Sequence, residues 1–466
     1  MTAWKWIFAA TTTLFLATLA ALSIHFRPDR AIRVGTGGLA HIICSKTFVS
    51  GLDPQEVFAA TLERPGFRRL RHALSFQIDR KTKTVEASVL GFYKNRALFH
   101  DGLGCVEQHG TKQPYVLKND VEALKVPKTP PLLPEIAGPA VVEPADSALK
   151  TALDHAFEES AAPPFRRTKA VVVVHDGRVI AERYAPGIGI DTQLSGFSMT
   201  KSLINALIGV LNQHGLTSPS IPASIPEWRN IDDPRREIEI EHLMRMTTGL
   251  DLDETNSGFD RSSQMYLEDD LSAYAVNSRM IAPLGTRFHY SGATTQILAR
   301  VVRDLTGGPE QTLAFAWREL FNPLGMRNVT LEFDGAGTLQ GANYMLASAR
   351  DWAKLGVLYA NDGVVGGKKV LHPDWVDFCA AATLGTDYAA GFYTNRSDHP
   401  DAKGRVLSGM PRDSLLRVRP SGPAHRDRPV AQARRRAPRR YGRADRRHQR
   451  RRAAGERSDR RDRALN

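Results

Sequence analysis

A valine-rich β-hairpin constrains the fold of this 466-residue chain more than any other feature. Residues 170–175 are apolar and mostly β-branched, Asp176-Gly177 supplies a two-residue turn that accepts positive φ, and residues 179–184 return. A two-stranded sheet is only marginally stable in water, so the hairpin needs further strands from later in the chain. Between residues 193 and 382 the apolar periodicity is mainly helical. We therefore predict an α+β fold, in which an antiparallel sheet is flanked by helices and a large helical body is inserted after the first hairpin.

Changes in composition and pattern divide the chain into five segments. These are a signal peptide or membrane anchor (1–30), a small α/β module (34–118), a Pro-rich linker (119–146), the main domain (147–411) and an Arg-rich tail (412–466). The module is predicted from a helix capped by Asp53 and from the strand-like alternation of residues 84–89. Prolines cannot continue a helix or a central strand, which is why residues 119–146 are interpreted as a linker.

An uncharged, mostly apolar run occupies residues 6–26. It is longer than the ~7–15 residues of a usual signal-peptide core and about long enough to span a bilayer. We favour an anchor in the inner membrane, contacted through residues 6–26, and a cleaved signal peptide is the alternative. Either interpretation predicts a location in the cell envelope or periplasm. Arg27, Arg30 and Arg33 argue against simple export, because positive charges after such a run favour the cytoplasmic side.

Three cysteines are present in the sequence. Cys44 and Cys105 bracket the small module, and in an oxidising compartment they would form a disulfide worth roughly 4 kcal/mol for a loop of that length. Two unpaired buried thiols are the alternative. Cys379 lies in a helical stretch and is expected to be an inert core thiol.

Two chemical elements stand out in the main domain, and the first is Ser198-Met199-Thr200-Lys201. It lies where a loop meets an apolar helix over residues 202–211, so the serine and lysine share one helix face, about 5–6 Å apart at Cβ. A desolvated lysine is a competent base, and a serine activated in this way can form an acyl-enzyme. Ser147-Ala148-Leu149-Lys150 has the same spacing, but we interpret it as non-catalytic, because Ser147 or Asp146 caps a surface helix.

The second element is a turn-rich loop, residues 283–292, that contains Tyr290 and leads into another helix. Together, Ser198-x-x-Lys201 and Tyr290-x-Gly292 resemble the S-x-x-K and Y-x-N elements of class C β-lactamases, penicillin-binding proteins and related esterases. The chain is most similar to the 6-aminohexanoate-dimer hydrolase branch, over roughly residues 147–410. Further similar segments are residues 241–250 and 347–356.

The resemblance implies a β-lactamase/transpeptidase-like serine hydrolase, with Ser198 as nucleophile, Lys201 as general base and Tyr290 as proton relay to the leaving group. A tyrosine beside an ammonium group is drawn toward a working pKa, and a buried core phenol is the alternative for Tyr290. Gly292 departs from the family, because the β-lactamases have an amide side chain there. The departure favours a small ester or a linear amide as substrate, with β-lactam or peptidoglycan-peptide hydrolysis as the alternative.

Other candidate residues receive structural interpretations. His242 and His289 are expected to be structural or loop residues, and the acidic residues after Leu250 lack metal-ligand spacing. The sequence contains neither a phosphate-binding glycine loop nor a zinc pattern, so no cofactor and no metal is expected. A non-catalytic binding protein on the same scaffold is the alternative from a different functional class.

The net charge of +13 is carried by the C-terminal tail. From Arg412 onward there are 20 Arg, no Lys and six acidic residues, whereas the other 411 residues are nearly neutral. The family's third element, a strand with K-T-G or H-x-G that supplies an oxyanion-hole N–H, should follow Tyr290 by about a hundred residues. The Arg-, Pro- and Ala-rich tail cannot form such a buried strand, and we expect it to be disordered.

We predict that the tail is translated out of frame, through one extra base or two lost bases near Ser414. Residues 415–420 can be encoded as CTT CTT CGC GTC CGG CCA, and advancing by one base gives F-F-A-S-G-H. Permitted codons through about Arg440 extend this to FFASGHLGQRIVIVPSRKLVVVRLG, which contains the missing H-x-G and two β-patterned strands. A protein with the present sequence should then lack the last strands of its main sheet and be poorly folded or inactive. The alternative is a purposeful Arg tail that binds nucleic acid or membrane; we expect no nucleic-acid partner.

Overall fold

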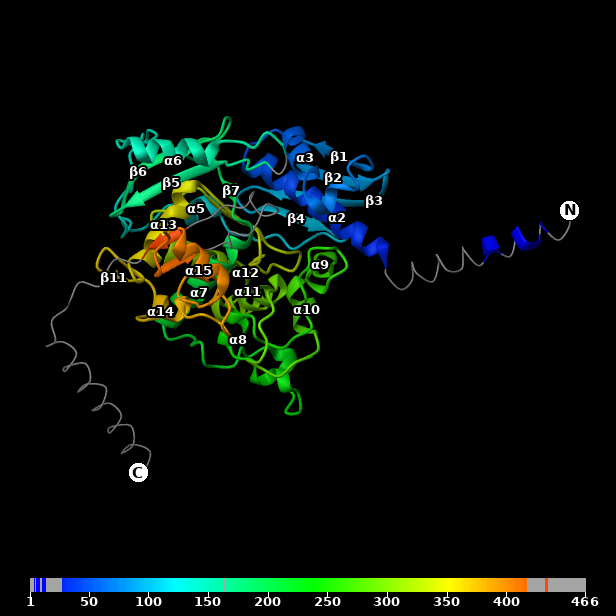
Figure 1. Ribbon diagram of the computed structural model, residues 1–466. Coiled ribbons are helices and arrows are strands. Elements are labelled where there is room, and N and C mark those ends of the chain that lie inside the picture. Colours follow the sequence, from blue (N-terminus) through cyan, green and yellow to red (C-terminus); the bar gives the residue numbers. More distant parts are fainter. Residues whose placement is uncertain are drawn as a thin grey trace, which may run out of the picture. The chain divides into compact units, whose positions relative to one another are not determined.

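The computed structural model describes residues 27–162 and 165–416, with short pieces at residues 4, 6–8, 11–13 and 432–434 (Figure 1). These residues belong to one compact unit, Met1–Arg434. The predicted membrane segment and the predicted out-of-frame tail lie almost entirely outside the described residues. Within the part of the chain that is described, no helix combines the length and the apolar character needed to cross a membrane.

In the small N-terminal module one long helix packs on an antiparallel sheet, and two shorter helices, α3 (Pro54–Leu62) and α4 (Pro65–Arg68), lie between them in the sequence (Figure 1). The sheet has the order β1-β2-β3-β4, and its strands are β1 (Leu74–Asp79), β2 (Thr84–Val89), β3 (Phe92–His100) and β4 (Gly104–Gln108). Helix α2 (Pro28–Cys44) buries Leu39, Ile43 and Cys44 against this sheet, and the Cys44–Cys105 disulfide joins it to β4. Asp53 accepts the backbone N–H groups of the first turn of α3, as its cap position predicts.

The Pro-rich segment 119–146 has the irregular backbone that its prolines predict, apart from α5 (Val121–Lys125), and it packs against the main domain. The carbonyl oxygens of Ile136 and Val142 accept the N–H groups of Val179 and Glu182, at 2.8 and 2.9 Å. Ile136 is buried. The segment therefore lies along the returning strand of the hairpin as part of the folded unit.

The predicted hairpin is present, with strands β5 (Ala170–His175) and β6 (Arg178–Tyr184). Asp176 and Gly177 form the turn, with φ of 50° and 78°, as a two-residue turn requires. Helix α6 (Ser147–Phe157) precedes the hairpin, and α13 (Ala349–Ala360) packs against β5. Among the described residues the hairpin remains a two-stranded sheet, and the side chains of its β5 valines are only half-buried.

The remainder of the main domain is the predicted helical body, with short strands between the helices. Its central helix is α7 (Thr200–Gln213), which is buried from Thr200 to Leu211. Other helices are α8 (Ile240–Arg245), α9 (Arg261–Gln264), α10 (Leu271–Val276), α11 (Gly292–Thr306), α12 (Pro309–Ala316), α14 (Trp375–Ala380) and α15 (Pro400–Leu407). The strands β7 (Leu194–Ser195), β9 (Met345–Ala347) and β8 (Val329–Leu331) form one antiparallel sheet, and β12 (Tyr393–Thr394), β13 (Ser414–Leu416) and β14 (Gln432–Arg434) form another. The prediction that the tail from Arg412 onward contains no buried strand is therefore wrong for residues 414–416, because Leu415 packs into the core and all three residues of β13 are buried.

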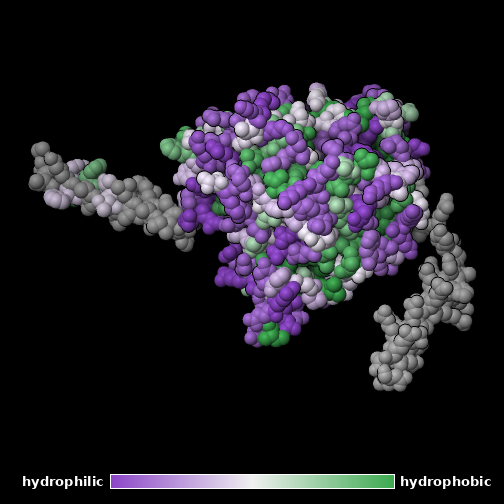
Figure 2. All heavy atoms as spheres, turned by 180° about the vertical axis from the view of Figure 1, so that it is seen from behind, coloured by the Kyte–Doolittle hydropathy of each residue, from purple (hydrophilic) through white to green (hydrophobic). Residues whose placement is uncertain are grey.

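Apolar residues of these helices form one continuous core, and hydrophilic residues cover most of the face seen in Figure 2. The mixed architecture of helices and antiparallel strands confirms the predicted fold class.

Candidate active site

Ser198 and Lys201 lie together where a tight turn enters the central helix. Ser198 is on the 3₁₀ turn Phe197–Met199, and Lys201 is in the first turn of α7. The Lys201 Nζ donates to Ser198 Oγ at 3.3 Å and to the carbonyl oxygen of Ala342 at 2.9 Å. Both side chains are buried. The amine is therefore within reach of the hydroxyl proton, and the Ala342 carbonyl fixes its direction.

The turn that carries Ser198 is held by close backbone packing. A Cβ at Gly196 would lie 2.2 Å from the Trp352 ring, so this position requires glycine. The Gly196 N–H donates to the Met345 carbonyl at 2.9 Å, which attaches the turn to β9. Phe197 has a φ of 43°, a strained conformation for a residue with a large side chain. Such strain next to a nucleophile is common in sites where the surrounding structure holds the backbone in place.

Tyr290 lies beside this pair, on the loop that precedes α11. Its ring centroid is 5.1 Å from Lys201 Nζ. The ring also packs edge-to-face on Tyr388, with 5.7 Å between centroids. Burial raises the pKa of Tyr388 well above its usual range, so Tyr388 is a neutral neighbour. The structure therefore brings together all three residues selected from the sequence.

A carboxylate that was not selected from the sequence lies next to these residues. The Gly292 N–H donates a short hydrogen bond to Glu254 Oε2. A Cβ at position 292 would lie 3.0 Å from that oxygen and 3.2 Å from the Cβ of Ala342. Gly292 has no side chain, and the Glu254 carboxylate therefore lies close to the position that the amide side chain of a Y-x-N element would occupy. In the sequence, only the glycine at position 292 indicated that another group could lie here, and it did not identify Glu254 as that group.

The other candidates have structural roles in the described part of the chain. His242 Nδ1 accepts the Glu239 N–H at 3.1 Å and so caps α8. Ser147 lies in the exposed first turn of α6, which Asp146 caps, and Lys150 pairs with Asp154. Cys379 is buried against Asn205, and burial raises the pKa of its thiol to about 12, as expected for an inert core thiol.

One group of possible metal ligands occurs among the described residues, formed by Asp387, His399 and Asp401. Asp387 already pairs with Arg405 at 3.0 Å, and His399 Nδ1 accepts the Asp401 N–H that begins α15. Because these donors are engaged in the fold, the group provides no built metal site.

Comparisons with known proteins match the domain that contains these residues. A family model described as Beta-lactamase matches residues 154–412. The 6-aminohexanoate-dimer hydrolase of Paenarthrobacter ureafaciens is 26% identical over 227 residues, which are 45% of this chain and 56% of that protein. The match therefore spans about half the length of that relative.

Solved structures of similar proteins include two penicillin-binding protein homologues. The one from Caulobacter crescentus is 18% identical, with a TM-score of 0.43 over 60% of this chain and 87% of that one. The one from Pyrococcus abyssi is 15% identical, with a TM-score of 0.39 over 50% of this chain and 62% of that one.

Proposed function

The chain belongs to the beta-lactamase family, and from this premise we propose that it is a serine hydrolase that cleaves a small ester or a linear amide through an acyl-enzyme on Ser198. The observation that carries the proposal is the 3.3 Å distance from Lys201 Nζ to Ser198 Oγ at the start of a buried helix. A hydroxyl and an amine at this distance form the nucleophile and base of a covalent mechanism.

The proposed reaction has two steps. Lys201 Nζ takes the proton of the Ser198 hydroxyl while Oγ attacks the substrate carbonyl, and the N-terminus of α7 favours the developing negative charge. The C–O or C–N bond of the leaving group breaks, and the leaving group takes up, through Tyr290, the proton that Lys201 accepted from Ser198. Water then attacks the Ser198 ester and gives a proton to Lys201, which passes it to Ser198 Oγ as the acid is released.

The substrate class follows from the surroundings of Gly292. The Glu254 carboxylate lies against the Gly292 N–H, where a negatively charged substrate group would meet a like charge. Penicillins and cephalosporins carry a carboxylate, so this environment favours neutral or cationic substrates. The relative named for a 6-aminohexanoate dimer, which is a linear amide, supports a linear amide as the bond that is cleaved; it does not support the charge preference, because that dimer also ends in a carboxylate. β-Lactam or peptidoglycan-peptide hydrolysis is the second candidate, and the family match is what favours it.

A fluorophosphonate probe tests the nucleophile. We expect covalent labelling of the Ser198 peptide and loss of this labelling in Ser198→Ala. Labelling should be retained in Ser147→Ala, which removes the serine of the second, exposed Ser-x-x-Lys segment. Labelling that persists in Ser198→Ala would refute the assignment. A folded chain that is never labelled would instead indicate a non-catalytic binding protein.

We also propose that the protein works in the cell envelope, where thiols are oxidised. The Cys44–Cys105 disulfide and the apolar run 6–26 support this location. Fractionation of the producing cells tests it: the full chain should be in the envelope fraction, and a chain without residues 1–26 should leave it. A full chain found with the cytosolic proteins would contradict the proposal.

A further inference from the structure

The N-terminal module binds a buried carboxylate of the main domain, Glu332, which lies on a loop that leads to the candidate site. We propose that Glu332 is a positioning residue: held by His41, Ser45 and the backbone of Cys105, it fixes the loop whose Ala342 carbonyl orients Lys201. The module would then be a working part of the hydrolase. This inference rests on the proposed function.

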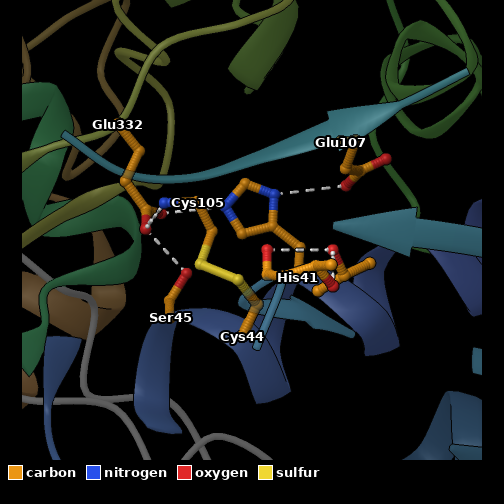
Figure 3. The surroundings of a disulfide bond; sticks show 8 residues. His41, Cys44, Ser45, Cys105, Glu107 and Glu332 are labelled. Atoms are coloured by element: carbon orange, nitrogen blue, oxygen red, sulfur yellow. Dashed lines mark hydrogen bonds and ion pairs between the residues drawn. A yellow bond between two sulfur atoms is a disulfide. The ribbon is translucent and has the colours of Figure 1, made fainter. Parts of the chain in front are cut away.

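The Glu332 carboxylate is fully buried at the end of β8, and both of its oxygens are bound by the module (Figure 3). Oε1 accepts from Ser45 Oγ at 2.7 Å and from the Cys105 N–H at 2.8 Å. Oε2 lies 2.8 Å from His41 Nε2. The disulfide joins Cys44, which precedes Ser45, to Cys105, which supplies the N–H, so it keeps these two donors together.

The module is built around this carboxylate and a second one. Gly104 has a φ of +72°, and a Cβ there would lie 2.5 Å from Glu332 Oε1. A Cβ at Gly37 would lie 2.8 Å from an oxygen of Glu107, whose other carboxylate oxygen is 3.4 Å from His41 Nδ1. Two glycines thus make room for the two carboxylates. Figure 3 shows Glu332 and Glu107 on opposite sides of the His41 imidazole.

Charge balance explains why this cluster can be buried. An isolated carboxylate in the interior is costly, and a pair with good hydrogen bonds offsets much of that cost. Burial disfavours the charged form of His41, but Glu332 and Glu107 outweigh it and raise the pKa of His41 to about 9. At neutral pH an imidazolium therefore bridges the two carboxylates.

Glu332 is connected to Lys201 by hydrogen bonds of the backbone. The Glu332 N–H donates to the Tyr344 carbonyl at 3.0 Å, so Glu332 and Tyr344 close the base of one loop. The His41 ring also stacks on Tyr344, with 4.0 Å between centroids. Within this loop, the Ala342 carbonyl accepts from Lys201 Nζ at 2.9 Å. The module therefore contacts both ends of this loop, Glu332 and Tyr344, and the loop orients the proposed base Lys201.

A second contact reaches the nucleophile from the same module. The Arg64 guanidinium lies 4.8 Å and the Lys46 Nζ 5.7 Å from the ring centroid of Phe197, the strained residue that precedes Ser198. Cation–π contacts of this kind stabilise by about 0.5–1 kcal/mol at exposed sites and more when desolvated. Ser50 Oγ also donates to the Gln193 carbonyl just before β7, at 2.5 Å. Both halves of the catalytic pair are thus supported from one module.

The test compares full-length Ser45→Ala and Glu332→Gln with Glu86→Gln. The control also replaces a carboxylate that holds two cations, Lys94 and Arg96 at 2.8 Å each, but on the sheet of the module. Two quantities are measured: the rate constant and the half-saturation concentration of fluorophosphonate labelling at Ser198, and hydrogen exchange of the peptide covering residues 340–346. Ser45→Ala removes one of the two donors to Glu332 Oε1, and it provides the test of the inference if Glu332→Gln does not fold.

We expect both site variants to lower the maximal labelling rate by about ten-fold or more, with an unchanged half-saturation concentration and faster exchange of residues 340–346. Glu86→Gln should change neither. Folded variants with unchanged labelling and unchanged exchange would overturn the inference, because Glu332 would then be only an interface residue. Faster exchange with an unchanged labelling rate would also overturn it. If the unaltered chain is not labelled at Ser198, the proposed function fails. Hydrogen exchange then tests the positioning role of Glu332 by itself: unchanged exchange of residues 340–346 in the variants would overturn that role, and faster exchange would support it.

Discussion

The buried cluster of His41, Glu332 and Glu107 should make stability depend on pH in a defined direction. The folded protein raises the pKa of His41 from 6.5 to about 9, so its contribution is present in full below pH 6.5. It is lost as the pH rises from 6.5 through 9, because in this range the folded state binds a proton at His41 that the unfolded state has already released. A difference of this size corresponds to an upper estimate of about 3 kcal/mol of unfolding free energy.

The reference for this measurement is the triple variant His41→Gln/Glu107→Gln/Glu332→Gln, which replaces all three members of the charged cluster with neutral amides. A single His41 substitution is a poor reference, because it leaves the Glu332 carboxylate buried at 0% exposure without its charged partner. Urea unfolding, followed by tryptophan fluorescence with the disulfide intact, gives the free energy of each protein between pH 6 and 10.

We expect the unaltered chain to lose about 3 kcal/mol more than the triple variant between pH 6.5 and 9.5. The ionisable groups outside the cluster are the same in both proteins, so their contributions cancel in the difference. Parallel pH profiles would refute the reasoning, since they would mean that His41 has the same pKa in the folded and unfolded states.

Four further predictions follow from the same structure. Replacing Cys44 and Cys105 with serine should lower the unfolding free energy by roughly 4 kcal/mol in urea titrations, and an unchanged midpoint would mean that the disulfide does not form in the protein. Glu254→Gln should increase labelling by fluorescent penicillin about ten-fold, because it removes the like charge beside Gly292; no increase would separate this carboxylate from substrate choice. Tyr290→Phe should lower kcat for an ester substrate about 10²–10⁴-fold with little change in KM, and full activity would assign the proton relay elsewhere. Resequencing the codons for residues 410–416 should reveal one base in excess or two lost, and restoring the frame should raise esterase activity about 10²–10³-fold. If the bases confirm the present frame, and the purified protein folds cooperatively and binds DNA with steep salt dependence, the Arg tail is genuine.

Local features of the sequence predicted the elements that depend on neighbours in the chain. Asp176-Gly177 determines its turn through its own φ angles, and Asp53 and Asp146 cap helices through N–H groups two or three residues away. The Ser198–Lys201 pair belongs to the same class, because helix geometry alone brings residues three apart onto one face. Such features can be read from a single sequence.

Contacts between distant segments could not be predicted in this way. His41 and Glu332 are separated by 291 residues, and nothing near either one indicates the other. Glu254 stood in an acidic loop, and only the fold brings its carboxylate to Gly292. The packing of Ile136 beside β6 also depends on the fold, because proline content predicts an irregular backbone but not where it lies. The membrane segment and the frame of the tail remain predictions.

Trapping the acyl-enzyme tests the central claim most directly. The protein is mixed with an activated acyl ester, quenched with acid within the first turnovers, and digested for peptide mass analysis. We predict that the peptide containing Ser198 gains the mass of the acyl group, that Ser198→Ala gains none, and that Lys201→Met gains it far more slowly. Ester hydrolysis that continues in Ser198→Ala, or an acyl group found on another residue, would contradict the account.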